Sequence, residues 1–234
     1  MKTTHPSAIT FGWDGVRAGF VRTLPVALGV AAYGLVYGVL ARQAGLSLWE
    51  GLSLSGLVFA GASQFVALDL WAHPLPVSAL IVTTLAVNLR HVLMGATLRP
   101  WFGGLTPLQA YGSMFFLVDE GWALTLTELN SGGSRASFLL GTGLALYLAW
   151  VGATGLGMTA GSLLGDPARL GMDFAFTAMF LALLAGMWRG RRDLAPWLAA
   201  GAVALLVEYF VPGKWHIVAG GRAGGLAGAL RHGR

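Results

Sequence analysis

Residues 23–41 read TLPVALGVAAYGLVYGVLA, a run of 19 residues without a charged side chain. A helix of that length extends roughly 28 Å, close to the thickness of the hydrocarbon core of a bilayer. Only 11% of the 234 residues are charged and 56% are hydrophobic, whereas soluble domains average about 25% charged residues. The run and the composition together predict an all-α, polytopic membrane protein.

Further apolar runs follow along the chain and predict a transmembrane helical bundle of about eight spans. They lie near residues 23–41, 51–71, 75–98, 108–128, 137–161, 170–188, 194–211 and 215–230. The last run is rich in glycine and contains Arg222, so seven spans is the alternative. Residues 10–22 alternate apolar, mostly aromatic, side chains with charged ones, a pattern typical of a short helix on the membrane surface; the alternative is an unstructured tail. Similar spacing of the first and last three spans indicates an inverted repeat, a common plan in secondary transporters.

The basic residues predict the orientation of these spans. With eight spans and an inner N-terminus, nine basic residues lie inside and four outside. The inner set is Lys2, Arg17, Arg22, Arg135, Arg189, Arg191, Arg192, Arg231 and Arg234, and the outer set is Arg42, Arg99, Arg169 and Lys214. Because cytoplasmic loops carry the excess of Lys and Arg, both termini are predicted to be cytoplasmic, with the chain in the inner (plasma) membrane.

Several kinds of site have no support in the sequence. The chain has no cysteine, which excludes disulfides, thiolate metal sites and a cysteine nucleophile. Its five histidines are scattered, so neither a metal nor another cofactor is predicted. The basic residues are too dispersed for a nucleic-acid surface.

The second run contains the stretch FAGASQF at residues 59–65, which is suited to binding a polar solute. Gly61 permits a local break in the helix, and a broken helix exposes backbone N–H and C=O groups that suit an amino-acid zwitterion. Ser63 and Gln64 would add further donors and acceptors. The alternative is a packing face of small residues with a glutamine whose hydrogen bonds are satisfied inside the protein.

The third run carries three polar residues, Asn88, Arg90 and His91. Asn88 and His91 are three apart and share a helix face, whereas Arg90 is turned away from them. Two interpretations of Arg90 remain open. Its side chain could reach the interface from near the end of the span, or it could pair with an acid on a neighbouring helix.

Asp119 and Glu120 lie near the middle of the fourth run. Ionisable groups near the bilayer centre cost about 2.5–3.5 kcal/mol each on insertion scales, so we expect these two to form an ion pair or to handle a polar solute. One could pair with Arg90 while the other faces a cavity. A carboxylate that is both buried and close to a cation is suited to proton exchange. The alternative is a static ion pair that joins two helices.

In order and spacing, these motifs resemble those of the AzlC family, the large subunit of branched-chain amino-acid exporters. The motifs are GLVYG at 34–38, FAGASQF at 59–65, NLRH at 88–91 and the acidic pair Asp119–Glu120. The resemblance covers about residues 16–164. It implies a partner, a small AzlD-type membrane subunit encoded separately.

Together these features predict a secondary transporter, with residues 1–234 forming one membrane transport domain. It is expected to export branched-chain or similar apolar amino acids in a manner coupled to protons. Substrate binding is assigned to Gly61, Ser63, Gln64, Asn88 and Asp119, and proton coupling or an ion pair to Asp119, Glu120, Arg90 and His91. The apolar side chain of the substrate is expected beside Phe59, Phe65, Leu93 and Met94. The alternatives are an intramembrane serine hydrolase built on Ser63 and His91, and a scaffold or channel subunit that does not itself transport.

Overall fold

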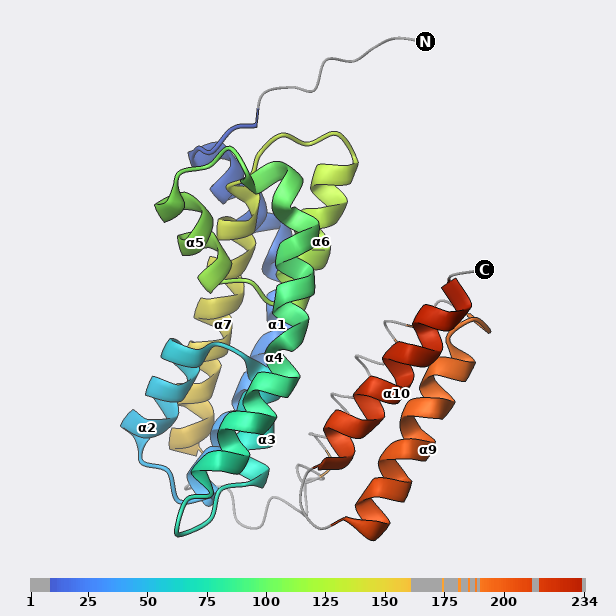
Figure 1. The fold of residues 1–234 in the computed structure, drawn as a ribbon. Coiled ribbons are helices and arrows are strands. Elements are labelled where there is room, and N and C mark those ends of the chain that lie inside the picture. Colours follow the sequence, from blue (N-terminus) through green and yellow to red (C-terminus); the bar gives the residue numbers. More distant parts are fainter. Residues whose placement is uncertain are drawn as a thin grey trace. The chain divides into compact units, whose positions relative to one another are not determined.

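The computed structural model describes residues 9–160, 174, 181, 185, 188, 190–211 and 215–232, and the regular elements in these ranges are helices (Figure 1). They are α1 (Trp13–Gln43), α2 (Leu48–Ser53), α3 (Gly61–Asp69), α4 (Val77–Phe102), α5 (Pro107–Phe115), α6 (Asp119–Asn130), α7 (Phe138–Ala160), α9 (Leu194–Phe210) and α10 (Trp215–His232). A π-helical segment, η1 (Leu54–Val58), continues α2. The predicted span near 170–188 lies outside the described residues, apart from single positions.

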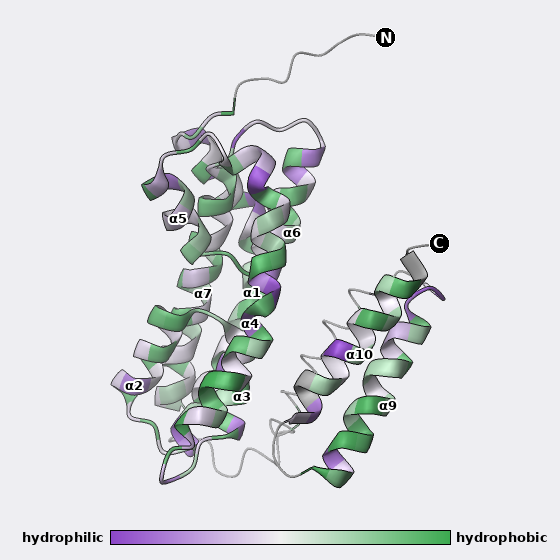
Figure 2. Cartoon of the chain, in the orientation of Figure 1, coloured by the Kyte–Doolittle hydropathy of each residue, from purple (hydrophilic) through white to green (hydrophobic). Residues whose placement is uncertain are grey.

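The described part of the chain has the character of a helical membrane protein. Within it, α1, α4 and α7 are long and apolar enough to cross a membrane, and α9 is a shorter apolar helix. Much of α4 and α9 is coloured as hydrophobic in Figure 2. Both helices expose large apolar side chains, among them Leu85, Leu89, Leu198 and Leu205, which a lipid environment can accommodate. The predicted all-α class is therefore confirmed for the described residues, while the count of about eight spans and the inverted repeat stay predictions.

The first helix is longer than the sequence predicts. α1 is one element of 31 residues with Pro25 inside it, so it joins the expected surface helix over 10–22 to the expected span over 23–41. Its contact with α7 explains this continuity, because the packing already begins at Gly15, whose backbone lies against Ser137. Whether residues 10–22 lie at the membrane surface stays a prediction.

α1 and α7 pack along their whole length with their backbones in contact (Figure 1). A Cβ atom on Gly19 would lie 2.2 Å from the carbonyl oxygen of Phe138, and one on Gly38 would lie 2.2 Å from that of Thr154. Glycine is therefore needed at both positions for this approach. Residue numbers rise together along the two helices, so they run parallel. That direction is consistent with three crossings in the chain between them.

The length predicted as one transport domain divides into two compact units, Met1–Leu68 with Asn88–Ala175, and Asp69–Val87 with Phe176–Arg234. In the first unit an apolar cluster links α4, the α5–α6 connection, the end of α6 and the start of α7. Its buried members are Met94, Leu98, Phe102, Leu117, Leu129, Ala136 and Leu139.

In the second unit, α9 and α10 form an antiparallel hairpin (Figure 1). A Cβ atom on Gly220 would lie 3.0 Å from the Cβ of Ala204, and one on Gly224 would lie 3.0 Å from the Cβ of Ala200. The glycine-rich run that made the eighth span doubtful is therefore helical, because its glycines let α10 lie close to the alanines of α9.

Candidate functional site

Two of the predicted spans are broken helices. Some of the predicted site residues follow the breaks, whereas Asn88, Arg90 and His91 lie within the continuous helix α4. In the span near 51–71, η1 ends at Val58 and is followed by Phe59, whose backbone has a left-handed conformation with φ of 43°. α3 then begins at Gly61. Gly61 itself lies against α7, because a Cβ there would be 3.1 Å from the ring of Trp150. The break therefore places Ser63 and Gln64 in the first turn of a new helix.

Gln64 is 2% exposed and belongs to a buried hydrogen-bond network. Its Nε2 donates to the Oγ of Ser55 at 3.2 Å, and its Oε1 accepts from the Nε1 of Trp150 at 3.1 Å. The Ser55 hydroxyl also bonds that of Thr154 at 3.0 Å. Both ends of the amide are thus occupied by protein groups, which favours the structural interpretation of Gln64 over direct substrate binding.

Ser63 and Asn88, two of the predicted substrate residues, are brought together from different helices. The Ser63 hydroxyl donates to the Oδ1 of Asn88 at 2.7 Å, which links α3 to α4. The Nδ1 of His91 lies 3.1 Å from the backbone oxygen of Asn88, within its own helix. Ser63 is therefore paired with an amide and not with the histidine that a serine hydrolase would need as its base.

The second break interrupts the span near 108–128 and positions the acidic pair. α5 starts with a capping box between Thr106 and Gln109, ends at Phe115, and gives way to extended backbone at Val118. Asp119 and Glu120 therefore occupy the first turn of α6, where the helix dipole favours negative charge. The sequence placed them in the middle of one continuous helix, so this break was missed.

Asp119 is the acid that pairs with Arg90. The Nη1 of Arg90 lies 2.7 Å from the Oδ2 of Asp119, and the two side chains are 30% and 31% exposed. The Nε of Arg90 is buried and makes no hydrogen bond within the described structure. The pair therefore bridges α4 and α6 while the buried Nε donor of the guanidinium has no hydrogen bond, an arrangement in which a further carboxylate could be bound.

An aromatic contact that the sequence did not predict joins the two breaks. Phe59 from the first break and Phe116 from the second both pack on Tyr147 of α7, with ring centroids 5.0 Å and 5.3 Å from that of Tyr147. Phe65 and Leu93, expected beside the substrate, lie elsewhere. Phe65 packs on Tyr37 and Trp150, and Leu93 is 70% exposed. A tyrosine within the long uncharged run after residue 136 is the signal that could have drawn attention to this contact.

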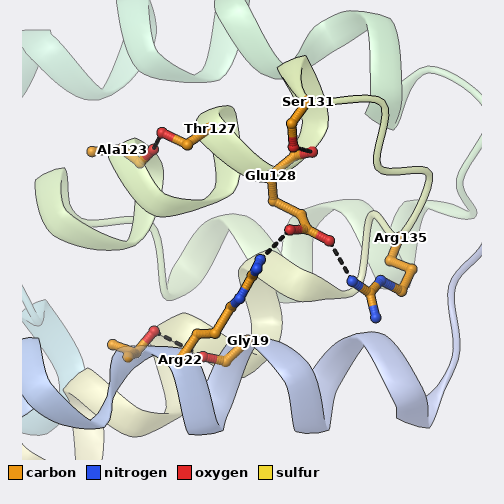
Figure 3. Close-up of polar contacts among 8 residues, drawn as sticks. Gly19, Arg22, Ala123, Thr127, Glu128, Ser131 and Arg135 are labelled. Atoms are coloured by element: carbon orange, nitrogen blue, oxygen red, sulfur yellow. Dashed lines mark hydrogen bonds and ion pairs between the residues drawn. The ribbon is translucent and has the colours of Figure 1, made fainter.

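A second ionic cluster lies at the end of α6 (Figure 3). Arg22 of α1 and Arg135 of the α6–α7 connection both donate to the carboxylate of Glu128. The connection is held in place by a 2.9 Å hydrogen bond from the backbone N–H of Ala136 to the carbonyl of Thr10. The hydrogen bond from Arg135 holds the pKa of Glu128 below its usual range; burial opposes this effect and Arg22 adds to it. The distribution of basic residues predicted that Arg22 and Arg135 lie on the same side of the membrane. Because both bond the carboxylate of Glu128, they must do so.

Replacing Glu128 with Gln is expected to lower the midpoint of thermal unfolding by about 2–4 °C, the shift that about 1 kcal/mol produces at this chain length. The effect is small because Arg22 and Arg135 are 62% and 41% exposed, and water replaces part of the interaction. Folding lowers the pKa of Glu128, so its contribution is complete above the pKa of the unfolded carboxyl and disappears as the pH falls through the folded value. The difference from wild type, measured in detergent, should therefore shrink on acidification.

The control is Glu208→Gln, at an exposed position of α9. An equal shift for the two variants would contradict the role of the ionic cluster.

The described ranges contain no cluster of potential metal ligands. No group of three or more His, Asp or Glu side chains there could hold a metal ion. Helix breaks and an ion pair inside apolar segments are features that membrane transport proteins use at their solute sites.

The comparison with known proteins agrees with this class. Residues 25–164, more than half of the chain, match the family model described as AzlC protein. The chain belongs to the AzlC family, whose naming indicates membrane transport.

Similar proteins cover most of the chain. An uncharacterized membrane protein of Archaeoglobus fulgidus is 34% identical over 90% of this chain and 92% of its own length. The branched-chain amino acid transport protein AzlC of Bacillus subtilis is 27% identical, over 79% of this chain and 72% of its own. The inner membrane protein YgaZ of Escherichia coli is 28% identical, over 88% and 85%. No solved structure matches the chain.

Proposed function

We propose that this protein is a secondary active transporter that exports branched-chain or similar apolar amino acids across the inner (plasma) membrane. Membership of the AzlC family supports transport as its role. The name of the Bacillus subtilis relative supports branched-chain amino acids as the substrate class. Both termini are proposed to lie in the cytoplasm, as the distribution of basic residues favours.

The observation that carries the proposal is the ion pair between Arg90 and Asp119 beside the second helix break. An amino acid presents a carboxylate and an ammonium group, and this pair offers one group of each complementary charge. The Nε of Arg90, a donor without a hydrogen bond in the described structure, suits the carboxylate. A neutral hydrogen-bonded pair adds to this site. Asn88 lies on α4, as Arg90 does, and its partner Ser63 lies on α3.

Proton coupling is proposed at Asp119. Its carboxylate can hold either the guanidinium of Arg90 or a proton, and a solute that binds Arg90 would change which of the two is favoured. The chain has no P-loop motif for nucleotide-driven transport, which leaves ion or solute gradients as the source of energy.

A small AzlD-type membrane subunit is proposed as the partner of this chain, and this proposal rests on the family resemblance. If such a subunit exists, the competing function for this chain is that of a scaffold or channel subunit, with the partner carrying the solute. The geometry at Ser63 argues against the hydrolase alternative, since its hydroxyl bonds Asn88 and not a base.

Efflux of labelled leucine and valine from cells tests the proposal. The cells lack their own exporters and carry this chain and its partner subunit together, each alone, or neither, at two external pH values. We expect saturable efflux only with both subunits, and a rate that depends on the external pH. Efflux that is unchanged by removal of this chain would contradict the substrate class.

A further inference from the structure

Three aromatic rings meet where the two helix breaks come together. Phe59 follows η1, Phe116 follows α5, and Tyr147 lies in α7. The ring centroids are 5.0 Å apart for Phe59 and Tyr147, 5.3 Å for Phe116 and Tyr147, and 6.3 Å for Phe59 and Phe116. We refer to Phe59, Phe116 and Tyr147 as the aromatic triad. Each of its rings contacts the other two edge to face or nearly so, an attractive geometry for aromatic side chains.

Separate features of the chain hold the aromatic triad in place. Phe59 keeps a left-handed backbone, with φ of 43°, which for a residue other than glycine costs of order 1–3 kcal/mol and is concentrated at functional sites. The Tyr147 hydroxyl donates to the backbone oxygen of Gly56 at 3.1 Å, a carbonyl in the segment that ends at the break. A Cβ atom on Gly143 would lie 2.3 Å from the Cβ of Phe116, so α7 needs a glycine where Phe116 packs.

Two rings of the aromatic triad each lie three to four residues before a member of a polar pair along the chain. Ser63, bonded to Asn88, follows Phe59 by four residues, and Asp119, bonded to Arg90, follows Phe116 by three. Groups suited to a zwitterion therefore begin both of the helices that start after the breaks. The rings of Phe59 and Phe116 occupy the breaks themselves, just before these polar groups in the chain.

We infer that the aromatic triad contacts the side chain of the transported solute and limits its size, which makes Phe59, Phe116 and Tyr147 specificity-determining residues. This inference rests on the proposed function and deepens it, since it assigns the apolar half of the substrate site. Rigid rings resist displacement, so each added methylene that does not fit is rejected about 10-fold or more. The sequence placed this contact at Phe59, Phe65, Leu93 and Met94, of which only Phe59 lies in the aromatic triad, and Met94 is buried in the apolar cluster of the first unit.

The test measures side-chain selectivity in proteoliposomes that contain the full chain and its partner subunit. Uptake of labelled leucine by counterflow is competed with unlabelled alanine, valine, leucine and phenylalanine. In Phe116→Leu and Tyr147→Leu, competition by phenylalanine relative to leucine is expected to rise about tenfold, because a ring is replaced by a smaller, flexible side chain. Tyr147→Phe keeps the ring but loses the hydroxyl that bonds Gly56, so its ratio should stay much closer to the wild-type ratio than that of Tyr147→Leu. The matched control is Tyr111→Leu, at a position of α5 that is 77% exposed.

Each outcome of this experiment decides the inference. A ratio unchanged from wild type in both leucine variants overturns it. If these variants lose all transport, Phe116→Tyr and Tyr147→Trp add bulk and must raise competition by alanine relative to leucine. An unchanged ratio of alanine to leucine in them overturns the inference equally. Wild-type vesicles that carry none of these amino acids overturn the proposed function together with the inference. Normal wild-type transport with unaltered selectivity in the variants overturns the inference alone.

Discussion

Replacing Asp119 with Asn is expected to lower pH-driven leucine efflux about 100-fold. The variant leaves Arg90 charged within an apolar span but without its carboxylate partner at 2.7 Å. An unpaired arginine near the bilayer centre costs about 2.5–3.5 kcal/mol on insertion scales, which corresponds to a factor of about 70 to 400 in a conformational equilibrium. Asparagine also cannot take up or release a proton, so the residual efflux should no longer respond to external pH.

Efflux at two external pH values is the measurement, with two variants as controls. Asp119→Glu keeps the charge and should retain part of the pH dependence. Glu120→Gln removes the neighbouring acid while leaving the ion pair with Arg90 intact, and is expected to have the smaller effect. A larger loss for Glu120→Gln than for Asp119→Asn would reverse this assignment.

A double variant separates a working ion pair from a static one. Arg90→Leu combined with Asp119→Leu removes both charges, and replacing such a pair with apolar residues is often neutral or favourable for stability. We expect the amount of folded protein to recover while efflux stays absent. Recovery of efflux in the double variant would mean that the pair only joins α4 to α6.

The regular helices could be predicted closely because composition alone determines them. The runs near 75–98 and 194–211 correspond to α4 (Val77–Phe102) and α9 (Leu194–Phe210). In an apolar segment each backbone N–H and C=O must find a partner inside the segment itself, so a long uncharged run has little alternative to a helix. The N-terminal start of α1 could not be predicted in this way, because contact with α7 extends the helix through Arg17 and Arg22.

The helix breaks were only half predictable. Gly61 indicated the first break, although the left-handed residue is Phe59, two positions earlier. The second break, between Phe115 and Asp119, contains neither glycine nor proline and carries no local signal. Its cause is tertiary, since Phe116 packs against Tyr147 and into the space above Gly143.

The hydrogen-bond partners of the site residues also depend on tertiary structure. From the sequence Gln64 could equally bind substrate or be satisfied internally. Its partners Ser55 and Trp150 lie in η1 and α7, 9 and 86 residues away in the chain, and no local pattern indicates them. The pairing of Arg90 with an acid was among the interpretations, because charges in a medium of low polarity require partners.

Replacing Gly157 with Ala is expected to be among the most destabilising single changes in this chain. A Cβ atom there would lie 2.1 Å from the backbone oxygen of Leu35 and 3.0 Å from the Cα of Gly38. The clash is between the alanine Cβ and backbone atoms of α1, so neither side-chain rotation nor a small shift of a neighbouring side chain can relieve it. Overpacking costs about 1–3 kcal/mol even where side chains can adjust, and we expect at least about 3 kcal/mol here, with loss of most folded protein.

Gly152 provides a control on the same helix, because nothing lies within 4 Å of the position its Cβ would occupy. Alanine is favoured over glycine in a helix interior by about 1 kcal/mol, so Gly152→Ala should be neutral or slightly stabilising. The same substitution, five residues apart, is therefore expected to act with opposite signs. The measurement is the yield of monodisperse protein in detergent and the midpoint of its thermal unfolding. A shift of equal sign and size in both variants would show that backbone contact with α1 is not what constrains α7.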